Sequence, residues 1–322
     1  MSQTLEIVCD ESGAEGEKLV GGNTDVFAHA SVLMDLATAE AVIGELRGVR
    51  APTPASEYGA THVLRAKHRA ALWWLLGPDG PVLGHTHVYL VDKAFLMIGK
   101  VAGLLGADPW HDPRPTALTL YREGPSAFGA ARWAALLDAF NYLLRAKNGQ
   151  GVTVTVDDVF RLVGELRRAG GPAGAIMELL WAARPRIAEF RERLLAEPQA
   201  VPSLDPLIPG IVHAVGHWSR DGRPVRVAHD RQTTLTDERV AELRRLAPML
   251  AGLRLVDSHL DARVQVADVL AGVARKLASD VLNGRGDPGL TALLRPYVDA
   301  GSIWGDERSW AHLKPPGAVM TW

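Results

Sequence analysis

The chain of 322 residues has a single cysteine, Cys9, so it cannot form an internal disulfide. No uninterrupted apolar run approaches the ~20 residues of a membrane-spanning helix. The first residues also lack the basic and apolar regions of a signal peptide. These absences predict a cytoplasmic protein with no membrane partner. Cys9 lies within an apolar segment with no paired His in the sequence, which indicates a buried small side chain and not a nucleophile.

The sequence also lacks the motifs of two large enzyme classes. It has no Gly-rich phosphate loop and no Gly-x-Ser-x-Gly elbow, so an ATPase and a serine hydrolase have no support. The formal net charge of −2 gives no global electrostatic reason to expect nucleic acid as a partner. Arginines do gather locally, in residues 161–193 and 220–231. They could contact phosphates, but solvated helix faces are usually rich in arginine too.

What the chain does have is a pair of acids at the end of its first apolar run. Residues 5–9 predict a short buried strand, and Asp10 and Glu11 stand where it runs into a Ser-Gly turn. A late counterpart, Asp268, is embedded in an apolar helical stretch, residues 264–272. Asp and Glu are almost never fully buried unless they are paired or bind a metal. Clustered carboxylates offer the hard oxygen ligands that Mg2+ and Mn2+ prefer, so the sequence predicts a divalent-cation site.

A third acid, Asp230, closes the apolar segment 224–230, which also predicts a strand. In an α/β fold, central strands bring acids that are distant in sequence to one edge of the sheet. We therefore expect Asp10 and Asp230 to end neighbouring strands, with Asp268 projecting from a helix packed across them. Gly272 lies one helical turn after Asp268 and leaves room for close approach on the same face.

The pattern along the chain predicts a mixed α/β core that carries a helical insertion. Strand-like segments occur near both ends of the chain, whereas helical periodicity dominates the middle. The expected core is residues 1–125 and 219–322, and the expected insertion is residues 126–218. Within the core, 18–22 and 26–34 are predicted as a strand hairpin and 61–76 as one helix; within the insertion, 175–195 is predicted as one helix.

Two end motifs, Asp10-Glu11-Ser12-Gly13 and the 265–272 segment Gln-Val-Ala-Asp-Val-Leu-Ala-Gly, resemble those of a known family. It is the widespread bacterial domain-of-unknown-function group marked by Asp-Glu-Ser-Gly and Gln-x-Ala-Asp-x-x-Ala-Gly, regarded as RNase H-like in fold. Asp92 with Lys93 is similar to the family's strand-terminal Asp-Lys, and Asp230 to its later strand-terminal Asp. The resemblance implies an α/β, RNase H-like mixed sheet flanked by helices.

The resemblance also implies two-metal phosphodiester chemistry. Asp10 would bridge two Mg2+ or Mn2+ ions, and Asp230 and Asp268 would each complete one of them. Glu57 or Glu11 would supply the fourth carboxylate. Glu57 fits the family's Glu-x-Lys region, although Gly59 stands where the basic residue is expected.

Three of these assignments leave alternatives open. If the strand continues through Glu11, alternation directs its side chain to the face opposite that of Asp10. A bend at Ser12-Gly13 would instead bring both side chains to the same face. Lys93 would be either a substrate phosphate contact or the ion-pair partner of an acid, and Arg231 is a further candidate for substrate binding. Asp261, before the helix with Asp268, suits an N-cap, and Asp257 in the same polar segment is a reserve candidate for a metal ligand.

The most direct functional hypothesis is a metal-dependent nuclease. One alternative is a hydrolase or transferase for a small nucleotide-like phosphorylated molecule, with the helical block as a lid. Another is a non-catalytic RNase H-like binding module, which the glycine at position 59 favours. His85 and His87 share one strand face and suit zinc, but without a nearby Cys or acid in the sequence ordinary packing is the preferred interpretation. The tryptophans are suited to contacts in the core or between subunits, so a second copy of the chain is a possible partner in a homo-oligomer.

Overall fold

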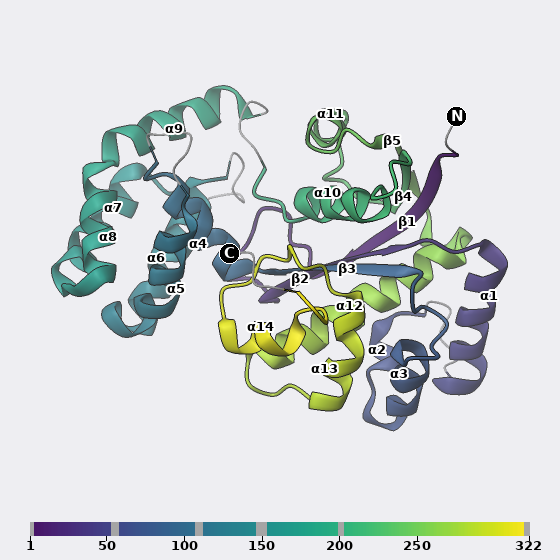
Figure 1. Cartoon of the computed structure of the whole chain (residues 1–322). Coiled ribbons are helices and arrows are strands. Elements are labelled where there is room, and N and C mark those ends of the chain that lie inside the picture. The colour runs from purple at the N-terminus through teal and green to yellow at the C-terminus, as the bar shows by residue number, and fades with distance from the viewer. Residues whose placement is uncertain (1–2, 53–57, 107–111, 146–152, 199–202, 319–322) are drawn as a thin grey trace.

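The centre of the fold is an open five-stranded mixed sheet with the order β3-β2-β1-β4-β5 (Figure 1). The computed structural model describes residues 3–52, 58–106, 112–145, 153–198 and 203–318. Its strands are β1 (Leu5–Ser12), β2 (Val26–Val32), β3 (Thr86–Asp92), β4 (Val225–Asp230) and β5 (Leu250–Val256). The expected α/β class, with a mixed sheet flanked by helices, is confirmed at this level.

Strand direction places the ends of β1 and β4 side by side. The two strands are parallel, with Cys9 opposite His229, whereas β2 runs antiparallel to both β1 and β3. β5 is parallel to β4. The interior of β1 is fully buried, because Ile7, Val8 and Cys9 have no exposed surface. The carboxyl ends of two parallel strands therefore meet at one edge of a rigid sheet.

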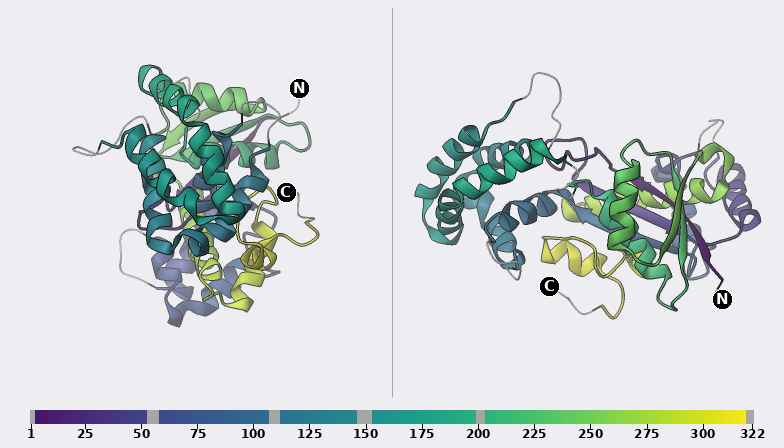
Figure 2. Two further views of the ribbon diagram at one scale, coloured as in Figure 1. Left: turned by 90° about the vertical axis from the view of Figure 1, so that its left-hand side faces the viewer. Right: turned by 90° about the horizontal axis from the view of Figure 1, so that it is seen from above.

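Helices cover both faces of the sheet and form a separate lobe beside it (Figures 1 and 2). On one face lie α1 (Leu36–Glu45), α2 (Ala60–Val63), α3 (Arg69–Leu76), α12 (Ala262–Leu282), α13 (Pro288–Leu294) and α14 (Glu307–Leu313). On the other lie α10 (Leu207–Trp218) and α11 (Asp237–Leu246). Between β3 and the lobe runs α4 (Lys93–Gly103), and the lobe is α5 (Arg114–Phe128), α6 (Ala130–Leu143), α7 (Val156–Leu166), α8 (Gly171–Ala182) and α9 (Arg184–Ala196).

The helix α12 is the main support of the sheet. Eleven of its 21 residues are buried, and it packs along β1 and β2 with Val266, Val269 and Leu270 in the core. Its N-cap is Asp261, whose side chain accepts a hydrogen bond from the backbone of Arg263, so the predicted cap is confirmed. Despite its 21 residues, neither α12 nor any other described helix has the length and hydropathy needed to cross a bilayer.

Three predicted elements are wrong. Residues 18–22 form no strand, because Leu19 is buried and its backbone N–H donates to Asn141 of α6 instead of to a strand. The single helix predicted over 61–76 is broken between α2 and α3, where Arg65 adopts an extended backbone. The helix predicted over 175–195 is also two helices, since α9 begins afresh at Arg184 with a proline in its first turn.

The helical lobe differs in extent from the expected insertion. It begins with α5, before residue 126, and it is complete at α9, before residue 218. The next helix, α10, packs on β2, β3 and β4 and so belongs to the sheet layer. The boundaries of a separately folding unit at 126 and 218 stay a prediction.

Candidate active site

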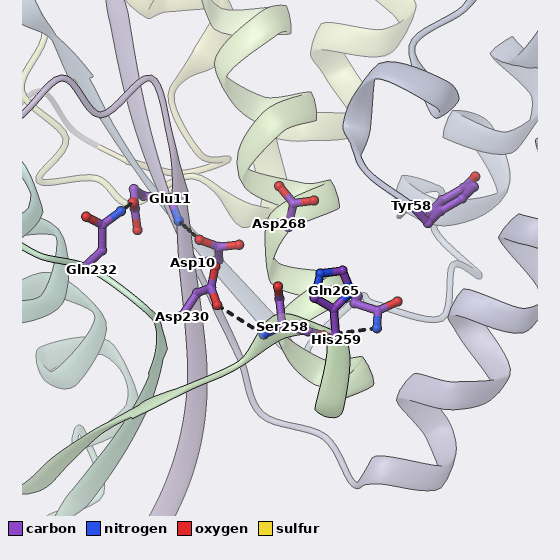
Figure 3. Close-up of a pocket in the computed structure, with 9 residues that line it drawn as sticks. All are labelled: Asp10, Glu11, Tyr58, Asp230, Gln232, Ser258, His259, Gln265 and Asp268. Carbon is purple, nitrogen blue, oxygen red and sulfur yellow. Dashed lines mark hydrogen bonds between the residues drawn. The ribbon is translucent and has the colours of Figure 1, made fainter. Parts of the chain in front are cut away.

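The predicted acids gather around one cavity at the carboxyl ends of β1 and β4. The cavity has a volume of about 260 Å³. Its lining consists of Asp10, Glu11, Tyr58, Asp230, Gln232, Ser258, His259, Gln265 and Asp268 (Figure 3). The sheet and α12 thus bring together acids that are up to 258 positions apart in the chain, from position 10 to position 268.

Asp10 occupies the most buried position among these acids. Only 7% of its surface is exposed, and its Oδ1 accepts a hydrogen bond of 2.7 Å from the backbone N–H of Glu11. Burial, together with the nearby charges of Glu11, Asp268 and Asp230, raises the pKa of Asp10 to about 9. Such repulsion is what a divalent cation would relieve.

Asp230 and Asp268 approach Asp10 from two different elements. Asp230 is the last residue of β4, and its Oδ1 accepts a 3.2 Å hydrogen bond from the backbone N–H of Ser258. Asp268 lies on α12, and in Figure 3 the carboxylates of Asp10 and Asp230 lie on the side of β1 that faces this helix. α12 comes close because Gly272 has no side chain: a Cβ there would lie 2.3 Å from that of Ala60.

Glu11 points to the opposite side of β1, towards Gln232 (Figure 3). The strand continues to Ser12, so Asp10 and Glu11 alternate between its two faces, and the predicted alternative of a bend does not apply. Gln232 Nε2 donates to Oε1 of Glu11, but Oε2 is buried without a hydrogen-bond partner among the described residues. His229 Nε2 lies 3.5 Å from that oxygen.

The pKa of Glu11 is raised to about 8, first by burial and then by the charges of Asp205 and Asp230. Burial also lowers the pKa of His229 to about 4. The imidazole is therefore neutral at neutral pH and offers Glu11 no compensating charge. A buried carboxyl with a pKa near neutrality is suited to hold and release a proton.

The remaining predicted residues have different places. Lys93 is 1% exposed, and its Nζ donates to Gly13 O (3.2 Å) and to Thr24 Oγ1 (2.7 Å). It also lies 3.7 Å from Glu15, as the ion-pair alternative predicts, and it does not line the cavity. Arg231 is largely exposed, with its Nη1 3.8 Å from Asp257. Glu57 lies outside the described residues.

The spacing of the cavity acids limits how they could share a cation. None of the described residues that line the cavity is Lys or Arg. No three of its described acids present ligand oxygens that all lie within 4.8 Å of one another. Two cations ~4 Å apart, with oxygen ligands at ~2 Å, would have outer ligands ~8 Å apart.

The structure also assembles a cluster that the sequence interpretation set aside. His87, His217 and Asp299 are the one described group of three His, Cys, Asp or Glu side chains whose ligand atoms all lie within 4.8 Å of one another. The acid beside His87 is Asp299, which is 212 positions away in the sequence. A local signal existed, because His213 and His217 are four residues apart on a predicted helix and so share one face.

Comparisons with protein-family models, curated proteins and solved structures find no match to this chain.

Proposed function

We propose that the chain is a metal-dependent phosphodiesterase that cleaves nucleic acid, with Mg2+ or Mn2+ as its cofactor. The observation that carries the proposal is the convergence of Asp10, Asp230 and Asp268 on one cavity at the carboxyl ends of β1 and β4. Asp10 is only 7% exposed, and acids are rarely buried unless they are paired or bound to a metal.

The architecture supports an RNase H-like assignment. The end-motif resemblance implies a mixed sheet flanked by helices, with the first motif on a central strand and the last on a helix packed across it. Asp10 lies on β1, the middle strand of the sheet, and Asp268 lies on α12, which packs along β1. Both motifs therefore contribute to the same cavity.

The positions of the acids suggest different roles. Asp10, whose pKa is raised by the charges of both Asp230 and Asp268, would be shared by two cations, and each of the other two acids would hold one. Such a cation pair would activate a water molecule and stabilise the leaving oxygen of the phosphodiester. Glu11 lines the cavity from the other side of β1, and its raised pKa of about 8 suits it to exchange a proton with water there.

A cleavage assay tests the proposal. Purified protein is incubated with labelled single- and double-stranded DNA and RNA, with Mg2+, Mn2+ or EDTA. We expect cation-dependent cleavage by the wild type and a loss of at least about 100-fold in Asp10→Asn. The matched control is Glu40→Gln, an exposed acid on α1, which should cleave as the wild type does. Equal cleavage by Asp10→Asn, or none by the wild type, contradicts the proposal.

The size of the cavity favours a second candidate function. A volume of about 260 Å³ is just below the ~300–1,000 Å³ of typical small-molecule sites. It matches one phosphate with part of a nucleoside better than a length of strand. The candidate is hydrolysis of, or transfer from, a small nucleotide-like phosphorylated molecule. A panel of nucleotides with phosphate detection separates the two, since Asp10-dependent turnover of nucleotides without strand cleavage supports the second.

A further inference from the structure

A second polar cluster lies on the sheet face that α10 covers, away from Asp268 and α12. His87 comes from edge strand β3 and His217 from the last turn of α10. Asp299 comes from the segment that follows α13, which lies along β3 through the bridges Val88↔Val298 and Val91↔Ile303. Three separate parts of the chain therefore meet at this point, and none of these side chains lines the acid cavity.

The contacts within the cluster fix its geometry. His87 Nε2 and Asp299 Oδ2 are 2.6 Å apart, and His213 Nδ1 lies 3.2 Å from Asp299 Oδ1. The rings of His87 and His217 stack with centroids 4.3 Å apart. Two imidazoles and a carboxylate thus present their ligand atoms within 4.8 Å of one another.

His87 is held inside the fold. Its side chain is 2% exposed, and Nε2 is the ring nitrogen that faces Asp299, so the ring is already in position to act as a ligand. His217 and Asp299 are partly buried beside it.

We propose that His87, His217 and Asp299 form a structural site for a transition-metal cation of the Zn2+ class, with His213 as fourth ligand or as the residue that orients Asp299. Imidazole and carboxylate ligands favour Zn2+, whereas the all-oxygen acid cavity favours Mg2+ or Mn2+. Ligands at 2.0–2.1 Å in a tetrahedron lie about 3.3 Å apart. Entry of the cation therefore needs His87 and Asp299 to separate by only about 0.7 Å from their 2.6 Å contact.

The site would hold the C-terminal part of the sheet layer together. The Asp299 segment joins β3 through two isolated bridges, and α10 packs against β3. A cation shared by β3, α10 and this segment crosslinks all three. Because metal binds the native state and not the unfolded chain, it should raise the thermal stability of the protein.

Cobalt spectroscopy tests the site directly. Protein without a histidine tag is stripped with chelator and titrated with Co2+, and then the bound Co2+ is competed with Zn2+. We expect one equivalent with the intense visible bands of tetrahedral coordination, which Zn2+ then abolishes. His217→Ala and Asp299→Asn should each weaken binding more than about ten-fold. His85→Ala, in an exposed His just before the same strand, is the matched control and should bind as the wild type does.

Two further arms separate this site from the acid cavity. The double variant Asp10→Asn with Asp268→Asn should keep the tetrahedral cobalt spectrum, so the site can be verified even if the nuclease proposal fails. Loss of the bands in that double variant would assign the cation to the acids and overturn the inference. The wild-type spectrum decides alone if both ligand variants fail to fold: the absence of tetrahedral bands means a hydrogen-bonded cluster without metal.

Discussion

Gly59 lies directly beside the carboxylate of Asp268, since a Cβ atom on Gly59 would be 3.3 Å from Oδ2. Position 59 is also where the motif resemblance leads one to expect a basic residue. As a glycine, position 59 places no side chain of its own beside this carboxylate. A lysine side chain would begin within contact distance of the carboxylate, where its ammonium could replace a cation as partner.

Gly59→Lys should therefore weaken cation binding at the acid cavity. An added positive charge near Asp268 repels Mn2+ by more than 1.4 kcal/mol at an effective dielectric of about 20, so we expect about ten-fold weaker binding or worse. Calorimetric titration with Mn2+ measures it. Gly59→Ala is the control and should retain most of the affinity, because it adds the Cβ without the charge. Equal affinity in wild type and Gly59→Lys would mean that Asp268 takes no part in the site.

Asp268→Asn should remove the stabilisation that Mn2+ gives while leaving the metal-free protein equally or more stable. Its charge is one of those that raise the pKa of Asp10, so its removal relieves repulsion. Thermal melts of wild type and variant, each with EDTA and with Mn2+, measure the effect. If the variant loses the same stability in both conditions, Asp268 is a structural partner and not a metal ligand.

The metal-free protein should lose stability as the pH rises from about 7 to about 9. Asp10 and Glu11 have folded-state pKa values of about 9 and about 8, whereas the unfolded chain has already released both protons. The native state thus binds more protons, and the free energy of unfolding falls with pH, by at most about 1.4 kcal/mol per unit and group. The buried histidines, with lowered pKa values, titrate below this window.

Denaturant melts across this pH range, in EDTA and in Mn2+, measure the slope. Mn2+ should flatten or reverse it, because a cation favours the ionised carboxylates. Asp10→Asn should reduce the metal-free slope. A slope that is the same with and without Mn2+ would show that no cation binds these acids.

Gly272→Ala should destabilise the protein and lower its activity together. The new Cβ would lie 2.3 Å from Ala60, so α12 must move away from α2, and Asp268 moves with it. We expect a loss of about 1–3 kcal/mol, as for other overpacked sites. The matched control is Gly44→Ala in α1, where no atom lies within 4 Å, and it should stabilise by about 0.5–1 kcal/mol. Two variants of equal stability would contradict a tight α12–α2 contact.

The local pattern of apolar residues correctly predicted those elements whose sequence favours one type of secondary structure. β1, β4 and α12 are rich in apolar residues, and α10 was predicted at its observed bounds, Leu207–Trp218. The segment 18–22 failed because its partner is a side chain, Asn141 of α6, which no local pattern reveals. The breaks at Arg65 and at Arg184 were missed because the apolar period continues across them.

The acid cavity could be predicted from the sequence because each acid ends or interrupts an apolar run. Gln232 was missed as a partner of Glu11. The contact of His87 with Asp299 was missed because that acid becomes a neighbour only when the C-terminal segment lies along β3. Contacts between elements so far apart depend on the packing of the whole sheet and not on spacing.

The position of the antiparallel strand β2 limits which insertions and deletions this sequence can tolerate. It pairs with β1 and β3 at once, and Ser31 stands opposite both Cys9 and His87. A single-residue slip of β2 would turn every one of its side chains to the other face and shift both partners. One deletion within Val26–Val32 would therefore disable the acid cavity and the histidine cluster together, although neither is built from β2.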